Sequence, residues 1–243
     1  MKTKIALAVA IFSASVAAES DAHYFSQDRL NTDSNVSLSY VDYFSISGGY
    51  EVMEGLKINA FYDDTVDGRF GVGATWVGGS FGNPIESMEG DLIWGIDAYY
   101  ANSGDSQSFM GSRFKYDVNE VVATFAMSGQ VNSDLRVGAH TGIAYASIDV
   151  SASTPGFPSV SESDSTTGFL LGADAQYFFQ DRAYALVSAE FVFGDADSYI
   201  ITPGAGYQLD RFDLAAGFYF LKTTFAGDSF TDNGLTLSAK FFF

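Results

Sequence analysis

Apolar and polar residues alternate along most of this chain, in segments of roughly ten residues that recur up to the C-terminus. In the segment 168–179, the odd positions from Phe169 to Phe179 are all apolar or aromatic, whereas the even positions include glycine, aspartate and glutamine. Successive side chains of a strand point to opposite faces, so this pattern predicts strands with one apolar and one mixed face. Segments 135–147 and 235–243 show the same pattern.

A soluble β-sandwich also alternates, but three features favour a membrane barrel. Aromatic residues gather near the ends of the apolar faces, as an interfacial girdle requires. The opposite faces hold glycine, serine, threonine and single charges, which are too small and polar for a sandwich core. The connections between segments alternate between short and long. The sequence therefore predicts an all-β fold, an antiparallel up-and-down transmembrane β-barrel.

We expect about twelve strands, with ten or eight as alternatives. The count falls to ten if 36–52 forms one long strand and one further pair merges. The expected strands cover residues 34–42, 44–52, 56–63, 69–81, 91–101, 119–131, 135–150, 167–180, 183–195, 198–208, 211–224 and 234–243. An even number of strands places both termini on the periplasmic side. The longest connections, 102–118 and 151–166, are then expected to be extracellular loops.

The first residues have the pattern of a secretory signal peptide. Lys2 and Lys4 precede the apolar stretch 5–14, and Val16-Ala17-Ala18 supplies small residues for cleavage after Ala18. The stretch is too short for a membrane-spanning helix, which needs roughly 20 residues. We therefore expect a signal peptide at 1–18, a polar periplasmic tail at 19–33 and an outer-membrane β-barrel at 34–243. The expected location is the cell outer membrane of a Gram-negative bacterium.

Charge and composition exclude several functions. The formal net charge of −18 argues against binding to nucleic acid, which requires basic patches. It equally argues against a polybasic surface for anionic lipid. The chain has no cysteine, so a closed sheet is the expected source of rigidity in an exported protein. No run of about 18 apolar residues follows the signal peptide, which excludes helical spans.

The last ten residues, Gly234 to Phe243, alternate apolar and polar positions and end in an aromatic residue. This segment resembles the signal that the barrel-assembly machinery reads on outer-membrane proteins. The resemblance implies that Phe241 and Phe243 form the assembly signal, and that the assembly machinery, outer-membrane lipid and lipopolysaccharide are partners.

A broader resemblance covers about residues 36–243. It is carried by Ile46 to Val52, by Leu56 to Tyr62, and by 168–179 followed by Asp181-Arg182 and a new strand. These elements resemble the small bacterial outer-membrane β-barrel domain family, which includes opacity-type, adhesin-type and porin-like barrels. Many members of that family have eight strands, whereas we expect about twelve here. The resemblance implies a fold and not an activity.

The predicted barrel interior contains a set of charged or titratable residues that forms the candidate polar network: Glu51, Lys57, Asp63, Arg69, Asp97, Arg136, His140, Asp174, Glu190, Asp213 and Lys240. These side chains could line a solute-selective pore. They could instead pair with one another and fill the barrel, which is favoured because an isolated buried charge is costly. Many inward positions are glycine, such as Gly71, Gly138 and Gly172, which leaves room for water and keeps a narrow channel open as a hypothesis.

No catalytic, cofactor or metal site is expected. The chain has two histidines, His23 in the tail and the inward-facing His140, and a serine hydrolase of the outer membrane would need such a base on the lipid-facing wall. Acidic residues of the expected loops could bind divalent cations that bridge to lipopolysaccharide, although solubility is the simpler interpretation. These residues are Asp63, Asp64, Asp67, Asp105, Asp117, Glu162, Asp164, Asp195, Asp197, Asp228 and Asp232.

Two functions follow from this interpretation. The first is a porin-like or structural outer-membrane barrel with a polar lumen. The second is a surface barrel that binds host cells or matrix through its extracellular loops, above all 151–166, which contains Pro155, Pro158 and several serines. An enzyme is not expected.

Overall fold

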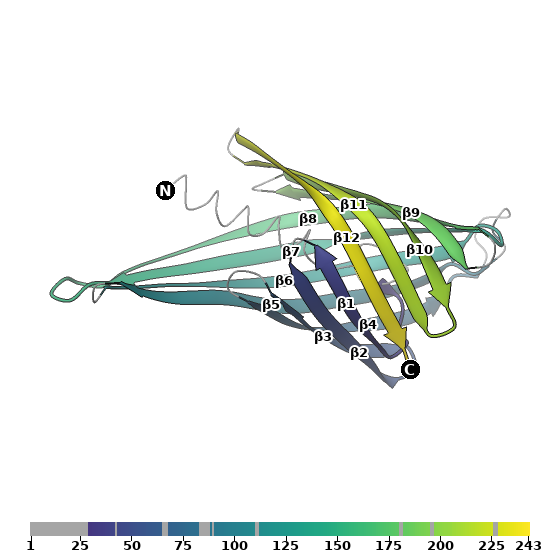
Figure 1. Cartoon of the computed structure of the whole chain (residues 1–243), viewed down its shortest axis with the longest axis horizontal. Helices are drawn as coiled ribbons and strands as arrows, with labels where there is room; N and C mark the ends of the chain where they lie inside the picture. Colours follow the sequence, from purple (N-terminus) through teal and green to yellow (C-terminus); the bar gives the residue numbers. More distant parts are fainter. Residues whose placement is uncertain are drawn as a thin grey trace.

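The fold of this protein is a closed barrel of antiparallel strands, seen from the side in Figure 1. The computed structural model describes residues 29–41, 43–64, 68–82, 88, 90–109, 112–179, 182–194, 197–225 and 228–243. The expected signal peptide, most of the expected tail, and His23, Asp67 and Asp195 lie outside these residues. Each strand pairs with its neighbours in sequence, and β1 closes the barrel against β12. The prediction of twelve strands in an up-and-down barrel is confirmed.

The twelve strands differ greatly in length, from seven residues in β1 to twenty in β8. Their bounds are β1 Asn35–Val41, β2 Phe44–Met53, β3 Leu56–Asp63, β4 Arg69–Ser80, β5 Ile93–Phe109, β6 Ser112–Gln130, β7 Leu135–Ser153, β8 Val160–Phe179, β9 Ala183–Gly194, β10 Asp197–Leu209, β11 Phe212–Phe225 and β12 Asp228–Phe242. The connections 54–55, 131–134 and 210–211 lie at one end of the barrel, here called the short-turn end. In the first of them, Gly55 has a φ of 75°, a conformation that glycine adopts without strain.

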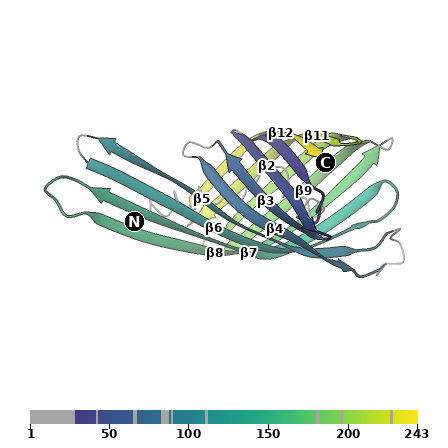
Figure 2. The same ribbon diagram turned by 90° about the horizontal axis from the view of Figure 1, so that it is seen from below.

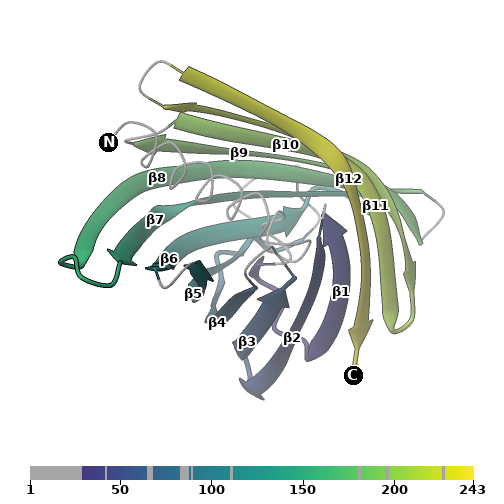
Figure 3. The ribbon, with the colours of Figure 1, turned by 60° about the vertical axis from the view of Figure 1, so that its left-hand side comes forward.

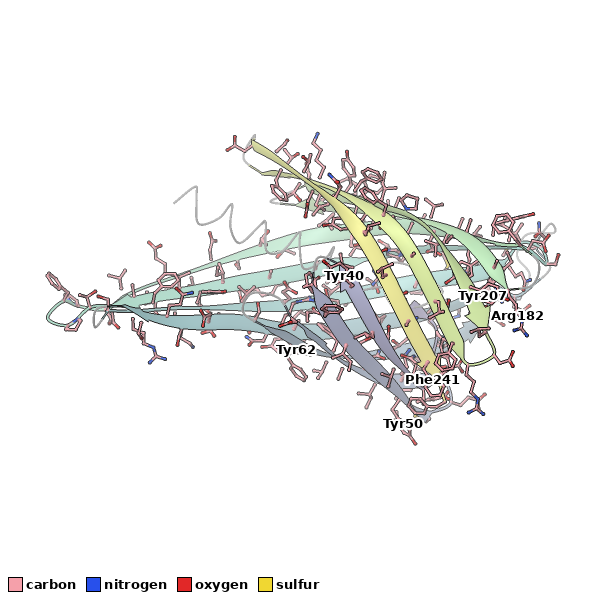
Figure 4. All side chains as sticks on the ribbon, in the orientation of Figure 1. Tyr40, Tyr50, Tyr62, Arg182, Tyr207 and Phe241 are labelled. Carbon is pink, nitrogen blue, oxygen red and sulfur yellow. The ribbon has the colours of Figure 1, made fainter. Side chains whose placement is uncertain are left out.

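The outer face of the barrel is apolar and its interior contains buried charged side chains, the reverse of a soluble protein. Large apolar side chains such as Leu38, Leu171 and Leu237 stand exposed on the outer face, and charged side chains are buried within. Aromatic residues mark both ends of this apolar face: Tyr50, Tyr207 and Phe241 lie toward the short-turn end, and Tyr40 and Tyr62 lie farther from it (Figure 4). An apolar band between two aromatic girdles is typical of a barrel in a lipid bilayer.

Four strands, β5 to β8, continue far beyond the rest of the barrel and project as a sheet of their own, which we call the extension (Figure 2). The ladder between β4 and β5 ends at Arg69 and Ser103, and the ladder between β8 and β9 ends at Gly168 and Gly194. Within the extension, β5, β6, β7 and β8 remain hydrogen bonded to one another almost to their tips.

The expectation of loops at 102–118 and 151–166 is therefore wrong, because both ranges are mostly strand. At the tip of the extension, β7 and β8 are joined by the short turn 154–159. The serine and aspartate residues of these ranges give them a composition that is typical of loops. Backbone pairing does not depend on side-chain polarity, however, and a sheet outside the bilayer needs no apolar face toward lipid.

Glycines on the inner wall make space for large neighbouring side chains. A Cβ at Gly71 would collide with the ring of Phe61, and one at Gly172 would collide with the imidazole of His140. Gly206 lies in the same way under the ring of Tyr184. The expectation that inward glycines leave room for water is thus wrong at these positions, because the space above each glycine is taken by a ring from the adjacent strand.

Two residues of the expected periplasmic tail lie within the barrel instead. Arg29 and Leu30 are both at least 96% buried, and Leu30 packs against the inner wall at Gly95. Figure 3 looks obliquely into the interior that the strands enclose. Within the described ranges, no helix is long and apolar enough to cross a bilayer.

Deleting Phe243 is expected to block assembly of the barrel without greatly weakening it. The Phe243 ring is 60% exposed, stacks on Phe241, and its backbone N–H donates to the carbonyl oxygen of Ser34, so little packing is lost with it. The aromatic terminus that resembles the assembly signal is lost entirely. Unboiled gels, on which a folded barrel runs at a different apparent mass, should show slow refolding in detergent but little folded protein in outer membranes. Normal folded levels in the membrane would contradict this prediction.

Candidate functional site

The interior of the barrel is the candidate site, and Arg29 lies at its first charged layer. The Nη2 group of Arg29 donates to Glu190 Oε2 at 2.9 Å, and its Nη1 group donates to Thr124 Oγ1 at 3.5 Å. The same Nη1 lies 4.0 Å from Asp97 Oδ2. The single guanidinium of Arg29 thereby connects three strands, β5, β6 and β9. The first two are neighbours in the barrel wall, and β9 is a neighbour of neither.

The strands themselves orient the carboxylates that meet Arg29. His140 Nε2 lies 2.8 Å from the same Glu190 oxygen, and Thr75 donates its hydroxyl to Asp97 Oδ1 at 2.7 Å. Asn59 in turn donates to the Thr75 hydroxyl at 3.1 Å. These contacts hold the acceptors in fixed positions. The imidazole of His140 therefore faces the Glu190 carboxylate within the interior.

A second charged layer is built around Arg69. Its Nη1 donates to Asp63 Oδ2 at 2.9 Å and its Nη2 donates to Glu120 Oε2 at 2.5 Å, while the guanidinium lies 5.0 Å from the centre of the Phe61 ring. Ser45 donates to the other oxygen of Asp63 at 2.5 Å. Arg69, Asp63 and Glu120 are all at least 96% buried, so this is a desolvated ion-pair group.

An apolar layer separates the two charged layers. Along β5 the inward residue that follows Asp97 is Tyr99, and along β9 the inward residue that follows Glu190 is Val192. Along β6 the inward series runs Thr124, Val122, Glu120. Tyr99, Val122 and Val192 belong to one buried cluster, completed by Phe61, Ala101, Ala144, Ala146 and Leu170. The order along the interior is therefore charged, apolar and charged.

The remaining residues of the candidate polar network lie in smaller groups. Asp213 accepts a hydrogen bond from Tyr184 at 2.6 Å, Arg136 lies over the ring of Phe178, and Lys240 lies 6.0 Å from the ring of Phe242. Glu51 and Lys57 are direct partners across the ladder of β2 and β3. Asp174 is buried on the inner face of β8. The predicted residues therefore lie along the inner face of the barrel.

Sequence reasoning missed two residues that organise this interior. Glu120 lies two positions from Val122 and shares its face, so the alternation along the expected strand 119–131 was a sufficient signal to place it inside. Arg29 precedes the first strand and belongs to no alternating segment. Its position depends on contacts with β5, β6 and β9, and no local sequence pattern predicts it.

Comparison with known proteins shows which solved structures have a similar fold. No protein-family model and no curated protein matches the chain. Among solved structures it is similar to the KdgM porin, with a TM-score of 0.50 and 12% identity over 87% of this chain and 99% of that one. It is also similar to the translocator domain of the autotransporter NalP from Neisseria meningitidis, with a TM-score of 0.49 and 12% identity over 89% and 92% of the two chains. This protein has the fold of a bacterial outer-membrane β-barrel.

Outside this outer-membrane barrel interior, the extension carries a second polar feature. A pocket of about 210 Å³ is lined by Lys115, Asp117, Asp149, Val150, Ser151, Ser161, Glu162 and Ser163. Within the described part of the chain, no three histidine, cysteine, aspartate or glutamate residues gather closely enough to hold a metal ion. The expected binding of divalent cations by acidic residues stays a prediction. Among those that the structure describes, eight lie on strands and not on loops: Asp63, Asp105, Asp117, Glu162, Asp164, Asp197, Asp228 and Asp232.

Proposed function

We propose that this protein is a narrow, porin-like channel in the outer membrane of a Gram-negative bacterium. The observation that carries the proposal is the layered interior, in which buried charged groups lie on both sides of an apolar layer of side chains from β3 and β5 to β9. Eight strands enclose just enough space for side chains, and sixteen to eighteen leave an open aqueous channel. Twelve strands lie between these cases, as expected for a path that side chains constrict.

The apolar layer supplies a physical means of gating. An apolar constriction in a pore excludes water and stops conduction until it widens. Leu170, which is 1% exposed, belongs to this layer, together with Val122 and Val192. The charged layers around Arg29 and Arg69 favour hydrated or charged solutes over apolar ones. The KdgM porin shares the fold, which supports a channel without naming a solute.

Replacing Leu170 by serine is expected to increase conductance through a planar bilayer, because a hydroxyl in the apolar layer lets water enter it. The matched control is Leu171→Ser, the same change at the next residue of β8, whose side chain stands on the outer face and is 47% exposed. The wild-type protein should give small or rare steps, Leu170→Ser larger or more frequent ones, and Leu171→Ser steps like the wild type. Equal conductance for the two variants would contradict a path through this layer.

A surface interaction function is the second candidate, and the extension favours it. Strands β5 to β8 continue well beyond the other strands of the barrel (Figure 2), where a simple channel needs only short loops. Silence of all three proteins in bilayers, together with loss of binding to cells or matrix when 148–165 is replaced by a tight turn, would favour this function over a channel.

A further inference from the structure

The group around Arg29 forms a cage for a cation, which we call the cation cage and define as Thr75, Asp97, Thr124, His140 and Glu190. These residues come from five strands, and each is at least 96% buried. The cage presents two carboxylates and a hydroxyl to one position in the interior, and that position holds a guanidinium. Glu190 accepts a charge-assisted hydrogen bond from the guanidinium, which is strong and directional, and Asp97 adds a second negative charge 4.0 Å from it.

The cation in this cage is not part of the barrel wall. Arg69, by contrast, begins β4 and is fixed by the ladder that it starts. Arg29 belongs to the short stretch that precedes β1, which begins at Asn35. Only the side chain of Arg29 reaches into the cage, and the next residue, Leu30, packs on the inner wall at Gly95. The cage and its occupant are therefore separate parts of the fold.

We propose that the cation cage is a binding site for a small solute that carries a guanidinium or primary ammonium group, and that Arg29 is its tethered occupant. The inference deepens the proposed channel function and rests on it for the route by which the solute arrives. The chemistry of the site does not depend on that route. Two carboxylates at the distance of a single guanidinium select an N–H-bearing cation over an alkali ion or a quaternary ammonium, which cannot donate hydrogen bonds.

The wall is arranged to keep the cage intact when Arg29 is absent. Asp97 is oriented by Thr75, which Asn59 orients in turn, and Glu190 is oriented by His140. The Thr124 hydroxyl is also held, because it donates to the backbone carbonyl of Asp97 at 3.4 Å. Removing the Arg29 side chain takes away the guanidinium that contacts Glu190 Oε2 and Asp97 Oδ2, while the contacts of these carboxylates with His140 and Thr75 stay in place. The loss of a buried charge partner is destabilising, and a cation that returns to its position should reverse part of that loss.

The test is rescue of an Arg29→Ala protein by methylguanidinium. In detergent, the urea midpoint of unfolding of this variant should fall below that of the wild type. Methylguanidinium should raise it again in a concentration-dependent way, because a ligand that binds only the folded state stabilises it by RT ln(1 + c/Kd), which keeps growing with the ligand concentration c. Tetramethylammonium at the same concentration is the control for ionic strength, and it should have little effect. The wild-type protein, whose cage is occupied, should not respond to either cation.

Three results would overturn the proposal. They are an equal response of Arg29→Ala to both cations, an equal response of the wild type and the variant to methylguanidinium, and rescue that persists when Glu190→Gln is added to Arg29→Ala. The last variant removes a carboxylate of the cage, so specific rescue must be lost with it. If Arg29→Ala does not fold, Arg29→Gln fills more of the space and is tested in the same way.

Conductance separates this inference from the function on which it rests. If Arg29→Ala conducts and methylguanidinium blocks the current, both the channel and the cage are supported. Rescue of stability in a protein that never conducts supports the cage and contradicts the channel. Conductance without rescue supports the channel and contradicts the cage.

Discussion

Replacing Arg69 by alanine is expected to lower the free energy of unfolding by about 3–5 kcal/mol, the largest effect of any single substitution considered for this barrel. The change removes the cation that lies between Asp63 and Glu120, and both carboxylates stay buried. It also removes the contact between the guanidinium and the ring of Phe61. Urea titration in detergent, followed by the fluorescence of Trp76 and Trp94, measures the loss.

Two comparisons test the reason for this loss. Adding Asp63→Asn and Glu120→Gln to Arg69→Ala should restore part of the stability, because no uncompensated charge is left in the interior. Lys115→Ala breaks the exposed pair with Asp117 on the extension and should cost about 1 kcal/mol or less. If the triple variant is no more stable than Arg69→Ala, the loss comes from packing and the interpretation of the layer as an ion-pair group is wrong.

Replacing Ala173 by arginine is expected to destabilise the folded barrel in lipid by roughly 2–4 kcal/mol, the cost of a cation near the bilayer midplane. Ala173 lies on the outer face of β8, midway along the strand between Phe169 and Tyr177, two aromatic residues on that same face. Folding into lipid vesicles, followed as the folded fraction on unboiled gels across a urea series, measures the change.

Ser161→Arg is the matched control, because residue 161 lies on the same face of the same strand. It is exposed in the extension, beyond the apolar band, so arginine there meets water and should leave stability unchanged within about 0.5 kcal/mol. Equal tolerance of arginine at 161 and 173 would mean that the outer face of β8 does not contact lipid. That result would remove the main physical argument for placing this barrel in a membrane.

Both predictions depend on which side chains point into the barrel and which point outward, and the alternation of apolar and polar residues predicts these directions. The inward and outward assignments along 135–147, 168–179 and 235–243 follow from a period of two, because the pleat of a strand places successive side chains on opposite faces. The strand count follows from the turns between such segments. For the strand Leu56–Asp63, the expected and observed bounds coincide.

The sequence by itself also determined which charged side chains face the interior, since that depends only on parity along each strand. Arg69, Asp97, His140 and Glu190 all lie inside, at or near complete burial. Whether a residue has an odd or even position in its strand does not predict which of these side chains contact one another. The pairing of Arg69 with Glu120 joins strands that are not neighbours, and it depends on the curvature of the closed sheet and on the rotamers of long side chains.

Only the tertiary structure decided two further features. The extension forms because backbone hydrogen bonds continue between β5, β6, β7 and β8 after the apolar pattern has stopped, and a polar serine-rich sequence does not reveal this. Arg29 enters the interior because Asp97 and Glu190 meet there, brought together from strands 93 residues apart by barrel closure. Local sequence fixes the direction of each side chain, whereas long-range pairing fixes its partner.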